Sequence, residues 1–186
     1  MSEVWPLDVV NRLRKAGVDR LRPFKCLLLM PFESRFNRIA EEINTCLREV
    51  HDGSPYILGM PLPQINRLDW VISSGVIQNE IWEEVARADL IFCDITGYNP
   101  NVMFESGVAA ALKRMPQVVF IRDHFFKQQS AFDIAPIRYT EYELTSDGLP
   151  SFRDKVKKLI DDAFKGFPDD LIETILISFP ANIDFH

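Results

Sequence analysis

The chain has 186 residues, of which 47% are hydrophobic and 26% charged, and this composition predicts one globular domain with a sizeable core. The formal net charge of -6 argues against binding to a nucleic-acid backbone, so we expect no nucleic-acid partner. No apolar run approaches the roughly 20 residues that span a bilayer, and the first residues lack the basic and apolar regions of a secretory signal, which predicts a cytoplasmic protein with no membrane partner.

Helical and strand patterns alternate through the first part of the chain. Residues 7–16 have helical periodicity, and the unbroken apolar run CLLLMPF, residues 26–32, is typical of a strand buried on both faces of a parallel sheet. Apolar residues recur at helical spacing over residues 34–50, which predicts a helix packed on that strand. A second strand is expected at residues 56–60. Residues 61–72, with two prolines and no clean period, are not assigned.

The middle of the chain repeats this alternation. Capping residues before position 76 predict a helix over residues 76–88, and the apolar run LIFCDI predicts a second buried strand over residues 90–95. Asn99 and Pro100 are a strong helix start, with Asn as the N-cap and Pro at the first helical position. The helix that follows, residues 101–114, has a small-residue side expected to pack closely on the sheet: Gly107, Ala109, Ala110 and Ala111.

The last part of the chain begins with a third buried strand, predicted by QVVFIRD at residues 117–123. Residues 137–144 alternate less cleanly and predict an edge strand, and residues 151–164 predict a final amphipathic helix. The tail after Pro168 contains ETILISF, which is compatible with an extra strand or with docking on a partner subunit. The sequence leaves both alternatives open.

Because strand and helix alternate along most of the chain, we predict an α/β fold with a doubly wound, mostly parallel five-stranded sheet flanked by helices. This is a flavodoxin-like three-layer sandwich. The expected division is a helical extension at residues 1–24, a single domain at residues 25–167 and a tail at residues 168–186.

Three cysteines, Cys26, Cys46 and Cys93, form neither an even set nor a CxxC pair, which predicts small buried hydrophobes in a reducing compartment. The three histidines are scattered without metal-ligand spacing, so we expect no metal. Neither a Walker A sequence nor GxGxxG is present, and we expect no resident cofactor.

The stretch DITGYNPNVMFESG, residues 94–107, is the predicted functional centre. In open α/β sheets, ligands bind beyond the carboxyl ends of the strands, and Asp94 falls at such an end. Glu105 lies in the second turn of the next helix, where we expect the helix dipole to favour its ionised form. An ionised carboxylate there can attack a sugar carbon or stabilise an oxocarbenium-like transition state. Asp94 can bind sugar hydroxyls, or act as a general acid if burial raises its pKa.

Each of these residues also has an ordinary structural interpretation. Asp at a strand end often forms a turn, Asn99 is fully explained as a helix cap, and a helical Glu is usually exposed. The apolar character of the helix around Glu105 predicts instead that this carboxylate is enclosed, which calls for a functional reason.

The run ARADLIFCDITGYNPNVMFESGVAAALKR resembles the signature of a bacterial family related to nucleoside 2-deoxyribosyltransferases and to Toll/interleukin-1 receptor (TIR) domains. Three further segments resemble the same family: LLMPFESRFNRIAEEI, ISSGVIQNEIWEEVARAD and SAFDIAPIRYTEYEL. The likeness covers roughly residues 25–165 in the family's order. It implies a TIR-like three-layer fold.

The resemblance also implies site residues. The family's nucleophilic Glu matches Glu105, and an acidic residue of the transferases matches Asn99, which can hydrogen-bond but cannot donate a proton as an acid does. The implied catalytic residues are Glu105, Asp94 and Asn99. Those expected to bind substrate are Met30, Pro31, Phe32, Gly97, Tyr98 and Asn101. Relatives often complete their sites with a neighbouring subunit, so we expect a homo-oligomer.

The leading hypothesis is cleavage or exchange of an N-glycosidic bond in a nucleoside, a nucleotide or NAD. A non-catalytic TIR-like nucleotide-sensing or assembly module is the alternative, favoured by Asn99 in place of the acid. A structural α/β subunit of a larger complex is a third interpretation.

Overall fold

The computed structural model describes residues 22–57, 60–68, 77–114, 117–126 and 138–178. They form a five-stranded sheet in which every neighbouring pair is parallel, with the strand order β2-β1-β3-β4-β5. The predicted doubly wound α/β fold is confirmed, and the sheet is wholly parallel. Its strands are β1 (Lys25–Leu29), β2 (Gln64–Arg67), β3 (Leu90–Asp94), β4 (Val118–Asp123) and β5 (Tyr139–Tyr142).

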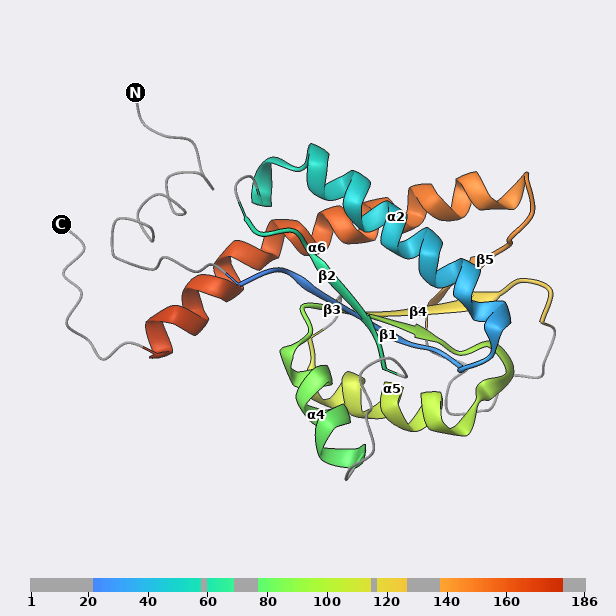
Figure 1. Ribbon diagram of the computed structural model, residues 1–186, viewed down its shortest axis with the longest axis horizontal. Coiled ribbons are helices and arrows are strands. Elements are labelled where there is room, and N and C mark those ends of the chain that lie inside the picture. Colours follow the sequence, from blue (N-terminus) through green and yellow to red (C-terminus); the bar gives the residue numbers. More distant parts are fainter. Residues whose placement is uncertain (1–21, 58–59, 69–76, 115–116, 127–137, 179–186) are drawn as a thin grey trace.

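Helices cover both faces of this sheet. Helices α2 and α6 lie together on one face, and α4 and α5 lie on the other (Figure 1). Within the described residues, three short 3-10 turns connect the elements. The helices are α2 (Asn37–Gly53), α4 (Ile77–Arg87), α5 (Pro100–Leu112) and α6 (Gly148–Ser178), and the turns are η1 (Ser34–Phe36), η2 (Pro55–Ile57) and η3 (Thr96–Tyr98).

Alternation along each strand divides the core into two apolar clusters. Leu28 and Phe92 pack with the cluster that includes α2 and α6, whereas Leu27 and Ile91 pack with the cluster that includes α4 and α5. Because both faces of the central strands are covered, these strands require continuous apolar sequence, which is why their positions could be recognised.

The second strand is not where the sequence predicted it. Residues 55–57 form the turn η2, and the strand is β2, from Gln64 to Arg67, within the segment that was not assigned. This strand pairs with β1 alone among the described strands and is mostly exposed or half-buried, so no apolar run marks it. Pro61 and Pro63, which cannot donate a ladder hydrogen bond, precede it.

The last helix is much longer than predicted. Helix α6 continues to Ser178, across the expected boundary at residues 167 and 168, and the residues of ETILISF up to Ser178 are helical rather than a strand. Phe24 packs on the part of this helix that ends at Phe167. Its ring lies edge-on against the rings of Phe164 (4.7 Å between centroids) and Phe167 (5.2 Å). Pro168 removes one backbone donor but does not end the helix. The predicted helix at residues 7–16 lies outside the described residues.

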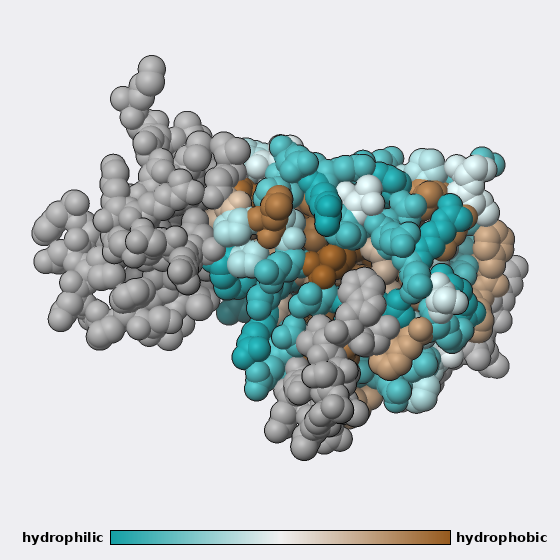
Figure 2. All heavy atoms as spheres, in the orientation of Figure 1, coloured by the Kyte–Doolittle hydropathy of each residue, from teal (hydrophilic) through white to brown (hydrophobic). Residues whose placement is uncertain are grey.

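The outer surface seen in Figure 2 is mostly hydrophilic, with small hydrophobic patches. Within the described ranges, no helix is long and apolar enough to cross a membrane. Cys26, Cys46 and Cys93 are free and buried, as predicted, and burial raises the pKa of the Cys46 thiol to about 11.

Phe92 tests the central packing of the sheet. Its side chain is 0% exposed in β3, so Phe92→Ala leaves a cavity and is expected to lower the free energy of unfolding by about 3 to 5 kcal/mol, measured by urea denaturation. Phe125→Ala is the control: this side chain is 63% exposed, and its loss should change stability by less than about 0.5 kcal/mol. Equal losses in both variants would contradict the assignment of Phe92 to the core.

Candidate functional site

A cavity of about 380 Å³ lies beyond the carboxyl ends of β1 and β3, the strands at the centre of the sheet order. From β1 the chain continues to β2 on one side, and from β3 it continues to β4 on the other, so the two loops diverge. A crevice at such a topological switch point is where open α/β sheets bind ligands, and the volume is in the range of small-molecule sites. Its lining comprises Met30, Pro31, Phe32, Glu33, Asn99, Asn101, Val102 and Glu105.

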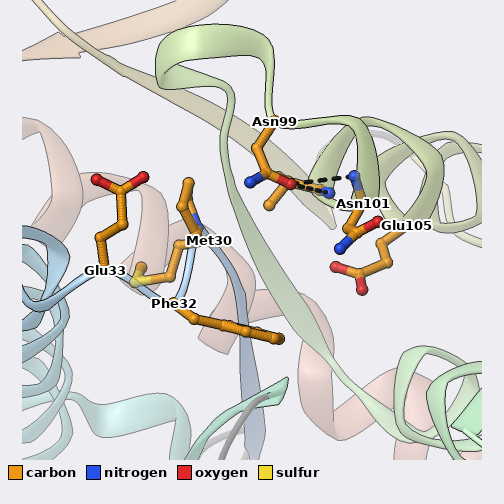
Figure 3. A pocket seen from close by; sticks show the side chains of 8 residues that line it. Met30, Phe32, Glu33, Asn99, Asn101 and Glu105 are labelled. Atoms are coloured by element: carbon orange, nitrogen blue, oxygen red, sulfur yellow. Dashed lines mark hydrogen bonds between the residues drawn. The ribbon is translucent and has the colours of Figure 1, made fainter.

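One wall is the segment Met30 to Glu33, which follows β1 directly. Met30 and Pro31 are buried, whereas Phe32 is 58% exposed and presents its ring to the cavity (Figure 3). Arg67, at the end of β2, fixes this wall from behind. Its guanidinium donates to the Pro31 carbonyl (2.7 Å) and to the side-chain oxygen of Asn37 (2.7 Å).

The opposite wall is the start of α5. The Asn99 side-chain oxygen accepts hydrogen bonds from the backbone N–H groups of Asn101 (3.0 Å) and Val102 (3.3 Å), drawn as dashed lines in Figure 3. Pro100 occupies the first helical turn, so the predicted cap and helix start are confirmed. Since the oxygen of Asn99 is used by the helix, its amide N–H₂ is the group left to donate to a ligand.

Glu105 is held in the cavity with little contact to water. Its side chain is 7% exposed and lines the cavity, and Figure 3 shows the carboxylate on the side where the Phe32 ring lies. Across the described part of the chain, we find no hydrogen bond or ion pair to this carboxylate. Burial raises the pKa of Glu105 to about 7. Desolvation therefore outweighs the favourable effect that we expected from the helix dipole, because Glu105 lies beyond the first turn, where the dipole is weak.

Asp94 is fully buried and does not line the cavity. Its carboxylate accepts hydrogen bonds from the Tyr142 hydroxyl (2.8 Å) and from the backbone N–H of Thr96 (3.0 Å). Burial raises its pKa to about 6, while these two partners oppose the rise. Both carboxylate oxygens are occupied, so Asp94 joins the ends of β3 and β5 and shapes the loop between β3 and α5.

Gly97 and Tyr98, predicted to bind substrate, belong to η3 and do not line the cavity. Gly97 has φ of +74°, and a Cβ atom there would meet the ring of Phe126 at 3.4 Å. Tyr98 also has a positive φ, 49°. These residues give the loop its sharp turn toward α5. Gly adopts a positive φ readily, whereas residues with a side chain adopt it only rarely.

The structure thus brings together six of the nine predicted site residues: Glu105, Asn99, Met30, Pro31, Phe32 and Asn101. Asp94, Gly97 and Tyr98 lie outside the lining. Three contributors were missed, namely Glu33 and Val102 in the lining and Arg67 behind it. Glu33 directly follows the predicted Met-Pro-Phe wall, which was a usable signal, whereas Arg67 lies in a strand that the sequence did not reveal.

The described residues contain no group of three or more His, Cys, Asp or Glu side chains that could hold a metal ion. Chemically, the cavity offers one enclosed carboxylate, a second and exposed carboxylate from Glu33, amide groups from Asn99 and Asn101, and the aromatic face of Phe32. This set can bind a neutral or cationic organic molecule and place a carboxylate against it.

Comparison with models of protein families finds no match, and comparison with curated proteins finds none either.

The raised pKa of Glu105 predicts a pH-dependent stability. Between pH 4.5 and about 7 the folded protein holds a proton that the unfolded chain has lost, so ionising Glu105 lowers stability as the pH rises through this window. In Glu105→Gln this contribution is absent. The variant should gain about 1 to 3 kcal/mol of unfolding free energy relative to the wild type between pH 4.5 and pH 8, measured by denaturation at each pH.

Asp94→Asn is the matched control for this experiment. The Asp94 carboxyl has its raised pKa near 6, so its contribution changes mainly below pH 6. Between pH 6 and pH 8, the unfolding free energy should therefore increase relative to the wild type in Glu105→Gln and should change little in Asp94→Asn. A stability difference that does not change with pH would show that Glu105 titrates normally.

Proposed function

We propose that this chain cleaves or exchanges the N-glycosidic bond of a nucleoside, a nucleotide or NAD, with Glu105 as the nucleophile or as the carboxylate that stabilises the oxocarbenium-like transition state. The observation that carries the proposal is the Glu105 side chain, 7% exposed, without a described partner, and facing a cavity of ligand size. The resemblance of residues 86–114 to the deoxyribosyltransferase and TIR signature supports the same reaction.

A buried carboxylate without a partner destabilises the folded state, and a substrate that carries or develops positive charge can act as the missing partner. As the bond between C1′ and the base nitrogen breaks, its electron pair goes to the base and positive charge develops on the sugar. The Glu105 carboxylate faces this charge in a cavity with restricted access to water, where electrostatic stabilisation is stronger than in bulk solvent. A water molecule, or an acceptor base in an exchange reaction, then completes the substitution at C1′.

The neighbours of Glu105 have supporting roles in this proposal. The Asn99 amide N–H₂ can donate a hydrogen bond to a ribose hydroxyl, although it cannot protonate a leaving base. Phe32 and Met30 offer apolar surface to a base. Asp94 has no direct part, because both of its oxygens are bound within the fold.

Replacing the carboxylate tests the proposal directly. Glu105→Gln should lower kcat/KM by at least about a hundredfold, followed as release of the free base from a panel of nucleosides, nucleotides and NAD by chromatography. In the wild type, kcat/KM should rise with pH up to about 7 and then level, because the ionised carboxylate is the active form. Undiminished activity in Glu105→Gln would refute the assignment.

A non-catalytic assembly module is the second candidate, and the outer face of α5 favours it. Phe104 (56% exposed) and Leu112 (50%) are exposed on this helix. Of the four small residues expected to face the sheet, Ala109 is buried, but Gly107, Ala110 and Ala111 are exposed. A helix that is apolar on both sides is typical of one that is covered by another surface. This also agrees with the expectation of a homo-oligomer.

If assembly is the function, sedimentation should show self-association of the wild type on adding a nucleotide, without turnover of any substrate in the panel. Phe104→Glu should weaken the association by about tenfold or more, because it places a charge in an apolar contact. Glu83→Gln on neighbouring α4, whose side chain is exposed, is the control that should leave association unchanged. Turnover by a monomer would count against this candidate.

A further inference from the structure

The charge on the cavity wall is unevenly distributed. Its lining contains two carboxylates, Glu33 and Glu105, and among the lining residues that the structure describes there is no Lys or Arg. Two arginines among the described residues contact this wall, and both are engaged in other interactions. Arg35 pairs with Glu33 (Nε–Oε2, 2.9 Å) and stacks on Phe36, and Arg67 is buried against the Pro31 carbonyl. The Glu33–Arg35 pair is exposed and therefore weak.

Two features of the cavity suit a cationic aromatic ring. The Phe32 ring is 58% exposed in the lining, and a cation placed over an aromatic face is attracted by the ring quadrupole. The Glu105 carboxylate comes from α5 on the opposite wall and is directed toward the side of the Phe32 ring, more than nine-tenths buried and without a described partner (Figure 3). A positive ring seated there supplies a counter-charge that none of the described residues gives to Glu105.

Among the described residues around the cavity, none is a suitable acid for the leaving group. A neutral purine or pyrimidine departs as an anion unless an acid protonates it. Asn99 carries an amide, Asp94 faces Tyr142, and Glu33 is exposed and paired with Arg35. A base with a quaternised ring nitrogen needs no such acid, because the electron pair of the broken C1′–N bond neutralises its own positive charge.

We propose that the substrate is an unphosphorylated nucleoside whose base carries a positive charge on the ring nitrogen attached to C1′. This inference rests on the proposed N-glycosidic function and narrows its substrate. In the reaction, the C1′–N bond breaks, its electrons pass to the ring nitrogen, and the base leaves neutral. Water then supplies hydroxyl to C1′, and one proton is released to solvent. Glu105 faces the ring cation before the bond breaks and the sugar cation afterwards.

Binding of the base alone tests the charge preference without any turnover. By calorimetry at pH 8, the cation 1-methylnicotinamide should bind about tenfold or more tightly than neutral nicotinamide. Glu105→Gln should remove most of this preference, and Glu33→Gln should reduce it. Glu83→Gln, an exposed charge outside the cavity, should leave it unchanged. Equal affinity for the two ligands, or a preference for nicotinamide, overturns the inference.

Turnover separates this inference from the proposed function. Nicotinamide riboside should be cleaved with a kcat/KM at least about tenfold higher than inosine, and higher than its own 5′-phosphate or NAD. If inosine or a phosphorylated substrate is cleaved as well or better, the proposed function stands and the inference is overturned. If 1-methylnicotinamide binds selectively but no substrate turns over, the charge preference is supported and the glycosidic function fails.

Discussion

At the centre of the sheet, β1 and β3 lie side by side, and the chain leaves them toward opposite edges. Because both strands are parallel, their carboxyl ends open at the same edge, and the loops that follow cannot fill the space between them. The Met30–Glu33 segment and the start of α5 therefore face each other across a cavity. The buried Arg67 fixes the first wall, and the Asn99 cap fixes the second. The position of Glu105 therefore depends first on the order of the strands in the sheet and only then on these local contacts.

The two carboxylates of the central stretch illustrate how environment divides roles between like groups. Asp94 and Glu105 are both buried, and burial raises the pKa of each. Asp94 is satisfied by Tyr142 and Thr96 and ties β5 to the end of β3. Glu105 has no such partner in the described structure. A buried carboxylate without a partner destabilises the folded state, so a contribution to stability does not explain why Glu occupies this position. Sites that sacrifice stability in this way are characteristic of binding and catalysis.

Helix α5 combines two constraints along a single segment. Its start must carry the Asn99 cap, its second turn must hold Glu105 in the cavity, and Val102, Val108 and Ala109 must pack on the sheet. The remaining positions were free to be polar, yet Phe104 is exposed there. The same helix therefore carries Glu105 toward the cavity and an apolar residue on its outer surface. The proposed catalysis and the proposed assembly are compatible, because they use different sides of α5.

The sequence by itself determined the elements that are buried on both faces and the helix start at Asn99, because continuous apolar runs and capping residues are local signals. It also located Glu105, since a Glu within an apolar helix is detectable without coordinates. Tertiary structure alone decided that β2 runs from Gln64 to Arg67 and that Arg67 supports the cavity wall. It likewise decided that Asp94 faces Tyr142 rather than the cavity. These features depend on contacts between segments far apart in the chain, and a side chain's direction at a strand end follows from which neighbours the fold brings to it.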